Sequence, residues 1–322
     1  MGAFVENIHF FGEEAIKAGN DLLEFIIVPG WGANLISIRE KETNNELLRV
    51  PSSLEQYLEV PMLYGTPILF PPNRIDKGRF TFEDRSYQFD INEVDRQNHS
   101  HGFVHDKKWE LIKAEVNGEI AEVVTEFDSS RFPDVIRQFP HHFILRMSFS
   151  LDGKVLHKNA EIINQSNETM PIGIGYHTVF QFPEDSSLFY LQAEKRWVLN
   201  DRLLPTGVLE EVPFIQDLKH GVSIEDLELD DVFQATPNAE GWNEAKLSIP
   251  SADLEVTYAA DGNFKQWVIF NMGGKSGFVC PEPYSWVTNA PNIDLPAFLT
   301  GLEGLKPGEA KSLKTSISVS RL

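Results

Sequence analysis

Apolar and polar residues alternate over several short stretches of this chain, and this two-residue period constrains the fold more than any other feature. The alternation is clear in residues 80–91 and again in residues 143–149. Side chains two positions apart lie on the same face of a β-strand, so each stretch predicts a strand with one buried face. The same reading predicts later strands at residues 267–270 and 313–319.

Turn residues separate these stretches at short intervals. Asn117-Gly118 is a strong hairpin signal, and it lies between strand-like residues 109–116 and 120–127. Residues 83–86 and Asp152-Gly153 predict two further hairpins in the same way. Many short strands joined by turns, without helices alternating between them, predict an antiparallel all-β sandwich.

Helical signals are few, and no stretch is rich enough in Gly, Ser and Pro to be a linker. Ser52 or Ser53 is a suitable N-cap for a short helix through Leu58, and residues 226–231 allow one further helical turn. A hydrophobic fraction of 42% supplies a real core. We therefore expect a large antiparallel β-sandwich with a few short helices, in a single domain over residues 1–322.

Charge and cysteine content exclude several classes of function. The chain has 48 acidic and 28 basic residues and a formal charge of -20, so we expect neither nucleic acid nor a membrane surface as a partner. Cys280 is the single cysteine, which fits a reducing compartment, and we expect a buried thiol there. Residues 1–11 do not resemble a signal peptide, and no apolar run is long enough to span a bilayer. We expect a soluble, cytoplasmic protein.

Two histidines lie one residue apart in Asn98-His99-Ser100-His101-Gly102. On a strand both rings would share one face and line one pocket; the alternative is a pair of structural loop residues. A zinc site would need a third ligand and often a fourth, for which His105 and His141-His142 are available. The chain has no His-Glu-x-x-His, no cysteine pair and no dense aspartate cluster, so we expect no metal.

Three single residues are further candidates. Arg74 follows an apolar run and needs an oxygen partner, either a carboxylate such as Asp76 or Glu83 or an atom of a ligand. His177 lies among apolar, strand-like residues, a setting more typical of a core histidine than of a catalyst. Glu282 stands between two prolines that restrict its backbone, so it is either an exposed acid in a proline-rich loop or a carboxylate held in a fixed direction.

Five segments of the chain, in order, resemble segments of the aldose 1-epimerase (galactose mutarotase) family. They are Pro72-Asn73-Arg74-Ile75 with Gly78 and Phe80; Asn98-x-x-His101-Gly102 followed by Trp109; His177 closing an apolar strand; Asp230-Asp231-Val232-Phe233; and Glu282 ahead of Asn289-Ala290-Pro291-Asn292. These segments span most of the chain. The resemblance implies a β-sandwich of the galactose-mutarotase type, with a sugar lying in an open cleft across one sheet.

The resemblance also implies a role for each matching residue. Glu282 would be the general base and His177 the general acid of ring opening and closure, which interconverts the α and β anomers of a free aldohexose such as galactose or glucose. The implied contacts to sugar oxygens are His101, Arg74 and Asp230, with Asn73 and His99 as looser placements. Only protons move, so no metal or redox cofactor is required. The expected partner is a small monosaccharide, bound by a monomer or a homodimer.

Departures from the family pattern leave the substrate open. Phe103 stands where the family usually has a second glycine, and Pro283 is also atypical. One alternative is a non-catalytic carbohydrate-binding protein. The other is a hexose-6-phosphate 1-epimerase, for which the candidate phosphate contacts are Arg131, Arg137 and Arg196. Because such epimerases typically lack the Asn73-Arg74-Ile75 element, a neutral hexose ranks above a sugar phosphate.

Overall fold

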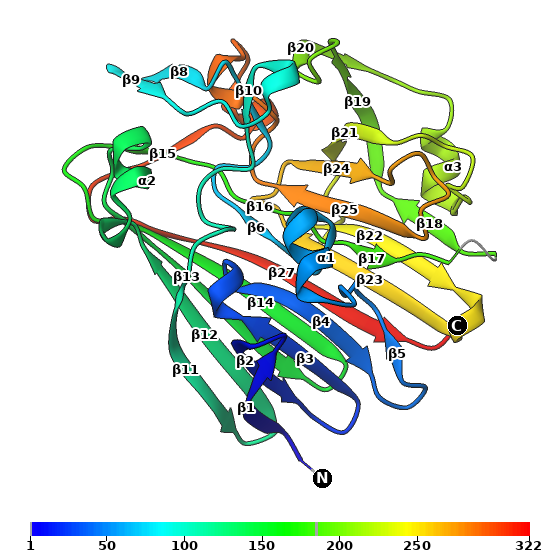
Figure 1. The fold of residues 1–322 in the computed structure, drawn as a ribbon. Helices are drawn as coiled ribbons and strands as arrows, with labels where there is room; N and C mark the ends of the chain where they lie inside the picture. Colours follow the sequence, from blue (N-terminus) through cyan, green and yellow to red (C-terminus); the bar gives the residue numbers. More distant parts are fainter. Residues whose placement is uncertain (1, 184–185) are drawn as a thin grey trace.

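The protein, described by a computed structural model over residues 2–183 and 186–322, is built mainly of antiparallel strands (Figure 1). An N-terminal sheet contains β1 (Phe4–Phe10), β2 (Glu13–Gly19), β3 (Leu23–Val28), β4 (Asn34–Glu40) and β5 (Asn45–Glu46) in chain order. A long sheet has the strand order β11 (Glu110–Asn117), β12 (Ile120–Asp128), β13 (Phe143–Asp152), β14 (Val155–Asn164), β27 (Ala310–Ser320), β23 (Leu254–Asp261), β22 (Trp242–Ile249) and β18 (Leu188–Leu191).

A third sheet, here the upper sheet after its place in Figure 1, carries Asp230, Cys280, Glu282 and Tyr284, which are discussed below. Its strand order is β20 (Pro205–Glu210), β19 (Ala193–Leu199), β21 (Asp230–Ala235), β24 (Gln266–Phe270), β25 (Phe278–Tyr284), β16 (Gly175–Tyr176) and β6 (Ile68–Leu69), with β17 (Phe180–Gln181) also paired to β25. Three two-stranded pairs complete the sheets: β10 (Asn98–Ser100) with β7 (Arg74–Asp76), β8 (Arg79–Phe82) with β9 (Arg85–Gln88), and β15 (Met170–Ile172) with β26 (Glu303–Leu305).

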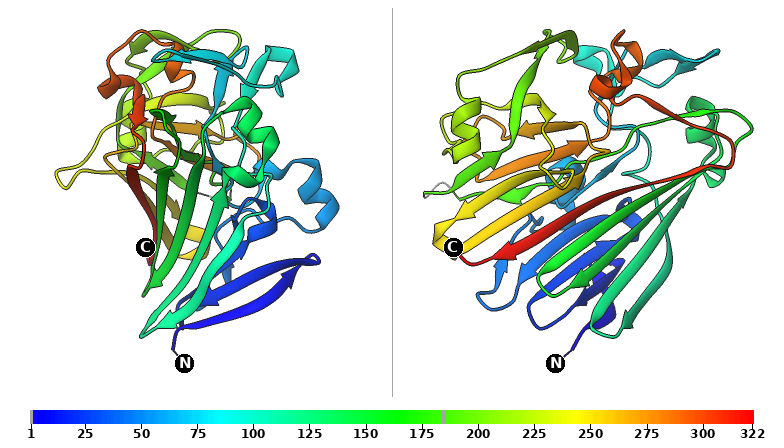
Figure 2. Two further views of the ribbon diagram at one scale, coloured as in Figure 1. Left: turned by 90° about the vertical axis from the view of Figure 1, so that its left-hand side faces the viewer. Right: turned by 180° about the vertical axis from the view of Figure 1, so that it is seen from behind.

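The N-terminal and upper sheets both lie against one face of the long sheet, as the two side views show (Figure 2). Side chains from facing strands meet between the layers. The Tyr258 ring on β23 packs edge to face on Trp267 of β24, with ring centroids 5.6 Å apart, and on Phe180 of β17 at 5.8 Å. Burial alternates along β23 with a period of two, as expected for a strand with one face in the core.

The expected fold class is therefore confirmed: the protein is an all-β sandwich with few, short helices. In the described residues the α-helices are α1 (Leu54–Glu59), α2 (Pro133–Gln138), α3 (Ile215–His220) and α4 (Ala297–Thr300). None of them is both long enough and apolar enough to cross a membrane.

Most local predictions hold. The Asn117-Gly118 hairpin forms between β11 and β12, and Ser53 caps α1 by accepting a 3.2 Å hydrogen bond from the backbone N–H of Gln56. The helical turn expected at residues 226–231 is wrong, because β21 begins at Asp230 and pairs with β24. The hairpin strand expected through residue 91 ends at Gln88.

Candidate active site

Two of the sequence segments singled out above form one antiparallel ladder. In the pairing of β7 with β10, Ser100 lies opposite Arg74 and His99 opposite Ile75. Just beyond the ladder, the backbone N–H of His101 donates a 3.0 Å hydrogen bond to the carbonyl of Asn73. The pairing explains how Asn73 and Arg74 come to lie beside His101, which is far from them in the sequence.

His99 and His101 do not share a face, contrary to the expectation for residues two apart on a strand. His101 has a φ of 66°, which turns the chain at the end of β10. The His101 ring lies across from His177, with centroids 5.7 Å apart, whereas His99 packs between Phe89 and Phe103 at 4.9 and 5.1 Å. The structure therefore places His101, but not His99, beside His177.

Gly102 provides a close approach between two backbone segments. It has a φ of 70°, and a Cβ atom built there would lie 2.1 Å from the carbonyl oxygen of Phe70. The next residue, Phe103, donates a 3.0 Å backbone hydrogen bond to that oxygen. The absence of a side chain at Gly102 thus lets the segment of His99 and His101 lie directly against the backbone of Phe70. The glycine serves this contact within the protein and not a contact with a ligand.

The Arg74 guanidinium is held by a carboxylate that sequence inspection did not single out. Its Nε donates to both carboxylate oxygens of Glu93, each at 3.0 Å, and one terminal nitrogen donates to Asn73 Oδ1 at 3.3 Å. The expected partners are otherwise placed: Asp76 pairs with Arg202 at 2.5 Å, and Glu83 is exposed. This anchoring leaves the outer part of the Arg74 fork available to a ligand.

Glu282 lies on strand β25 and is only 2% exposed, so the exposed proline-rich loop is ruled out. On its β24 side the ladder is continuous, with Glu282 opposite Val268. On its other side, β25 pairs within the described residues only at Phe278, Val279 and Tyr284, which leaves residues 280–283 without a partner strand there. Pro281 and Pro283, which have no N–H group, lie within this interruption and so cost the sheet little hydrogen bonding.

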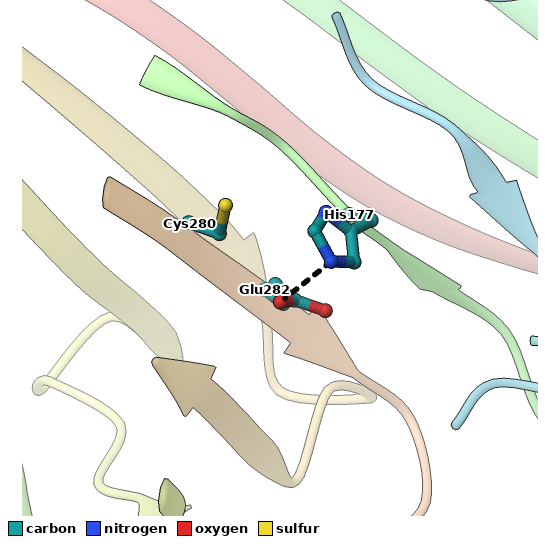
Figure 3. Close-up of side chains that lie close together, drawn as sticks. All are labelled: His177, Cys280 and Glu282. Atoms are coloured by element: carbon teal, nitrogen blue, oxygen red, sulfur yellow. Dashed lines mark ion pairs between the residues drawn. The ribbon is translucent and has the colours of Figure 1, made fainter. Parts of the chain in front are cut away.

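His177 directly follows β16 and faces Glu282 across the interrupted ladder (Figure 3). Its backbone N–H donates to the carbonyl of Pro67 at 3.0 Å instead of to β25. The His177 Nε2 atom lies 3.4 Å from Glu282 Oε1. This separation exceeds the roughly 2.7–2.9 Å of a direct charge-assisted hydrogen bond, so both atoms remain available to a bound molecule.

Burial controls the protonation of this pair. It raises the pKa of the Glu282 carboxyl well above its usual range, while a hydrogen bond from Tyr284 acts in the opposite direction. Burial also lowers the pKa of His177 to about 4 and lowers that of His101 well below its usual value. Burial therefore favours the uncharged forms of both partners. Moving one proton from the carboxyl to the imidazole leaves the net charge of the pair unchanged.

Asp230 approaches the same region from β21, where it lies opposite Phe270. The Phe270 ring in turn lies 6.2 Å from the ring of His177. Burial raises the pKa of Asp230, and the positive charges of Arg74 and Arg96 partly offset this shift. Asp230 thus lies within electrostatic range of both Arg74 and Glu282.

Sequence reasoning missed two residues that hold the site together. The Tyr284 hydroxyl donates a 2.5 Å hydrogen bond to Glu282 Oε2 from two positions along the same strand, so the period of two was the available signal. Glu93 accepts hydrogen bonds from Arg74, from Arg96 at 3.2 Å and from Asn98 at 2.8 Å. It lies among many acids in the sequence, and no local pattern marks it.

Among the residues that the structure describes, one group of three side chains has metal-ligand chemistry. The donor atoms of His177, Cys280 and Glu282 all lie within 4.8 Å of one another, and all three residues are buried (Figure 3). This group contains neither His99 nor His101, the histidines first considered as ligands.

Comparison with known proteins identifies the family. Residues 14–318 match the family model described as aldose 1-epimerase. The chain belongs to the aldose 1-epimerase family. Among curated members, galactose mutarotase of Rattus norvegicus is 25% identical over 208 residues, covering 62% of this chain and 58% of that protein. The uncharacterized protein YihR of Escherichia coli strain K12 is 24% identical over 311 residues, covering 94% and 93%.

Solved structures of aldose 1-epimerase relatives share the whole fold. A galactose mutarotase-like protein from Clostridium acetobutylicum superposes with a TM-score of 0.94 at 27% identity, covering 100% of this chain and 99% of that one. A putative aldose 1-epimerase from Escherichia coli K12 gives a TM-score of 0.77 at 20% identity, with both chains covered completely. At that lower identity the likeness concerns the fold alone.

Proposed function

We propose that this protein is a mutarotase that interconverts the α and β anomers of a free aldohexose such as galactose or glucose. The observation that carries the proposal is the pairing of Glu282 with His177, two buried proton-transfer groups whose nearest atoms lie 3.4 Å apart. Family membership supports the same reaction class. The 24–25% identity to the relatives above, one of which is uncharacterized, leaves the sugar to experiment.

Glu282 is the proposed base and His177 the proposed acid. The Glu282 carboxylate takes the proton of the anomeric hydroxyl while the His177 imidazolium gives a proton to the ring oxygen, and the C1–O5 bond breaks. The open-chain aldehyde turns about the C1–C2 bond, and the reverse transfers close the ring on the other face. Each positioned acid or base typically contributes about 10²–10⁴-fold.

The charge state of the pair fits this cycle. Ring opening leaves a protonated carboxyl and a neutral imidazole, which are the forms that burial favours. Burial therefore stabilises protonated Glu282 and neutral His177 while the open-chain sugar is bound. Ring closure returns the proton to His177 and regenerates the ion pair. The hydrogen bond from Tyr284 keeps the carboxylate form accessible for the first step.

Arg74, His101 and Asp230 are the proposed contacts to sugar oxygens. Arg74 offers charged donors, Asp230 is an acceptor beside it, and the neutral His101 ring offers one donor and one acceptor. Asn73 acts through Arg74, whose backbone and side chain both donate to its Oδ1. His99, which packs in the aromatic core, is the weakest of the proposed contacts.

A free sugar is favoured over a sugar phosphate, because each of the three arginines considered as phosphate contacts already pairs with a carboxylate. Arg131 pairs with Glu110 and Arg137 with Asp90, both at 2.5 Å. Arg196 pairs with Glu210 at 2.6 Å and with Asp231 at 2.9 Å. A phosphate would have to displace a carboxylate at each of them.

Polarimetry on freshly dissolved α-D-galactose and α-D-glucose tests the proposal. The wild-type protein is expected to accelerate the approach to anomeric equilibrium, and Glu282→Gln and His177→Asn each to lose about 10²–10⁴-fold of that rate. Glu83→Gln, which alters an exposed acid, is the matched control. Sugar binding in a calorimetric titration without any acceleration would instead establish a binding protein, and acceleration confined to glucose 6-phosphate a phosphosugar epimerase.

A further inference from the structure

Cys280 lies beside the proposed catalytic pair but takes no part in the proposed reaction. It stands two residues before Glu282 on β25, so the two side chains share a face of the strand. Figure 3 shows the thiol, the carboxylate and the His177 ring gathered at one place, and their donor atoms lie within 4.8 Å of one another. We propose that this cluster binds a thiophilic divalent cation, of which Zn²⁺ is the model, and that the cation inhibits the enzyme.

The spacing of the donors matches tetrahedral zinc. Zinc binds histidine nitrogen at about 2.0–2.1 Å and carboxylate oxygen at about 2.0–2.2 Å, so a tetrahedral angle separates the two by roughly 3.4 Å. The His177 Nε2 and Glu282 Oε1 atoms are 3.4 Å apart. Two of the three ligands are therefore already at the separation that the ion requires, and the Cys280 sulfur lies within 4.8 Å of both.

The chemistry of the cluster also selects the class of ion. A thiolate and a carboxylate together neutralise a divalent cation, and an imidazole adds no charge, so the buried complex has no net charge. The thiol proton, and the carboxyl proton where present, leave to solvent on binding. Sulfur and imidazole ligands favour zinc-like ions, whereas Mg²⁺ and Ca²⁺ prefer sets of oxygen ligands. Tyr284 orients the carboxylate from outside, as groups around metal ligands commonly do.

Inhibition follows from which atoms the cation occupies. It would take the Nε2 lone pair of His177 and an oxygen of Glu282, the two groups that exchange protons with the sugar in the proposed mechanism. The inhibitory consequence rests on the proposed function, but the binding does not. A fourth position would remain for water, as in zinc sites with three protein ligands.

Calorimetric titration of the whole 322-residue chain with ZnCl₂ tests the binding. We expect one zinc ion per chain, and at least about tenfold weaker binding by Cys280→Ser, which keeps the size of the side chain. His157→Ala removes an exposed histidine on β14 and should bind zinc as the wild type does. Equal affinity of Cys280→Ser and wild type would overturn the proposal, as would weakening by His157→Ala to the same extent.

X-ray absorption at the zinc edge gives a readout that needs no variant. Wild-type protein loaded with one equivalent of Zn²⁺ should show one sulfur neighbour at about 2.3 Å together with nitrogen and oxygen neighbours at about 2.0–2.2 Å. A spectrum with nitrogen and oxygen neighbours alone would place the ion elsewhere and refute the cluster.

The activity measurement separates this inference from the proposed function. Zinc should slow mutarotation of α-D-galactose by more than about tenfold at saturation, a chelator should restore the rate, and Mg²⁺ at the same concentration should have no effect. A wild-type protein that fails to accelerate mutarotation before zinc is added refutes the proposed function and leaves the calorimetric result standing. A fully active protein that binds no zinc refutes the inference alone.

Discussion

The hydroxyl of Tyr284 donates a 2.5 Å hydrogen bond to Oε2 of Glu282 from two residues further along the same strand. Glu282 Oε1, the other oxygen, faces His177. One carboxylate oxygen is thus held by the fold while the other points to the proposed acid. This division of the two oxygens fixes the direction of the carboxylate and opposes the effect of burial on its pKa.

Tyr284→Phe should slow mutarotation without unfolding the protein. A hydrogen bond to a charged group is worth about 1.5–3 kcal/mol, so kcat should fall about 10- to 100-fold. The loss also raises the pKa of Glu282 further, and the acidic limb of the pH–rate profile should therefore move to higher pH. Tyr176→Phe is the control, because among the described residues that hydroxyl donates a hydrogen bond only to the sulfur of Met147, at 3.7 Å. An acidic limb at the wild-type position would assign the base to another group.

Glu93→Gln should weaken sugar binding more than catalysis. Glu93 anchors the Arg74 guanidinium through two 3.0 Å hydrogen bonds, and Arg74 is a proposed substrate contact that transfers no proton. We expect KM to rise by about tenfold, equivalent to about 1.4 kcal/mol, while kcat changes by a few-fold at most. Steady-state polarimetry over a range of sugar concentrations gives both constants. A fall confined to kcat would contradict the assignment of Arg74 to binding.

Gly102→Ala should destabilise the protein far more than Gly118→Ala, although both glycines have a positive φ. A Cβ at residue 102 would lie 2.1 Å from the Phe70 carbonyl oxygen, whereas no atom of the described residues lies within 4 Å of one at residue 118. The free energy of unfolding of Gly118→Ala, in the β11–β12 turn, should fall by about 1 kcal/mol from the backbone conformation alone. The Gly102 variant should lose roughly 2–4 kcal/mol, because overpacking adds to that cost. Urea denaturation of the two variants measures the difference directly.

His141 should make the protein less stable in mild acid. Its buried ring shares a 2.8 Å hydrogen bond with the Tyr87 hydroxyl through Nε2 and a 3.1 Å hydrogen bond with Ser166 Oγ through Nδ1, so both ring nitrogens of the neutral imidazole have partners. Burial lowers the pKa of His141 to about 4. The unfolded chain takes up the proton near pH 6.5. The contribution to stability is therefore complete above about pH 6.5 and is lost as the pH falls toward 4, by about 1 kcal/mol per pH unit or less.

The variant His141→Asn isolates this contribution from those of the other buried histidines. Free energies of unfolding for the variant and wild type should converge between pH 6.5 and pH 4 and differ by a constant amount above pH 7. Parallel profiles across the whole range would show that His141 titrates with an ordinary pKa in the folded protein.

The strands were predictable because their signals are local. A two-residue period, a turn dipeptide and a helix cap each act within about ten residues. This is why the β11–β12 hairpin was predicted correctly and why the cap of α1 was narrowed to Ser52 or Ser53, of which the structure shows Ser53. The β25 strand was harder, because two prolines are typical of a loop or an edge. They are tolerated there because the ladder on one side of β25 is interrupted, and no nearby residue encodes that interruption.

The assembly of the site depends on contacts between distant segments. The sequence did not indicate that Arg74 would bind Glu93, or that His101 and His99 would point to different places. A positive φ at a histidine leaves no mark in the sequence, unlike one at a glycine. The roles assigned to the site residues, and the single domain over residues 1–322, stay predictions.

The position of β27 affects the order in which the chain can fold. In the long sheet β27 lies between β14 and β23, and it joins a ribbon of β11–β14 to a ribbon of β23, β22 and β18. During synthesis on the ribosome, both ribbons emerge before residue 310 and each presents an unpaired strand edge until β27 arrives. Such edges invite pairing with other chains, so the nascent protein is expected to be prone to aggregation until β27 is made.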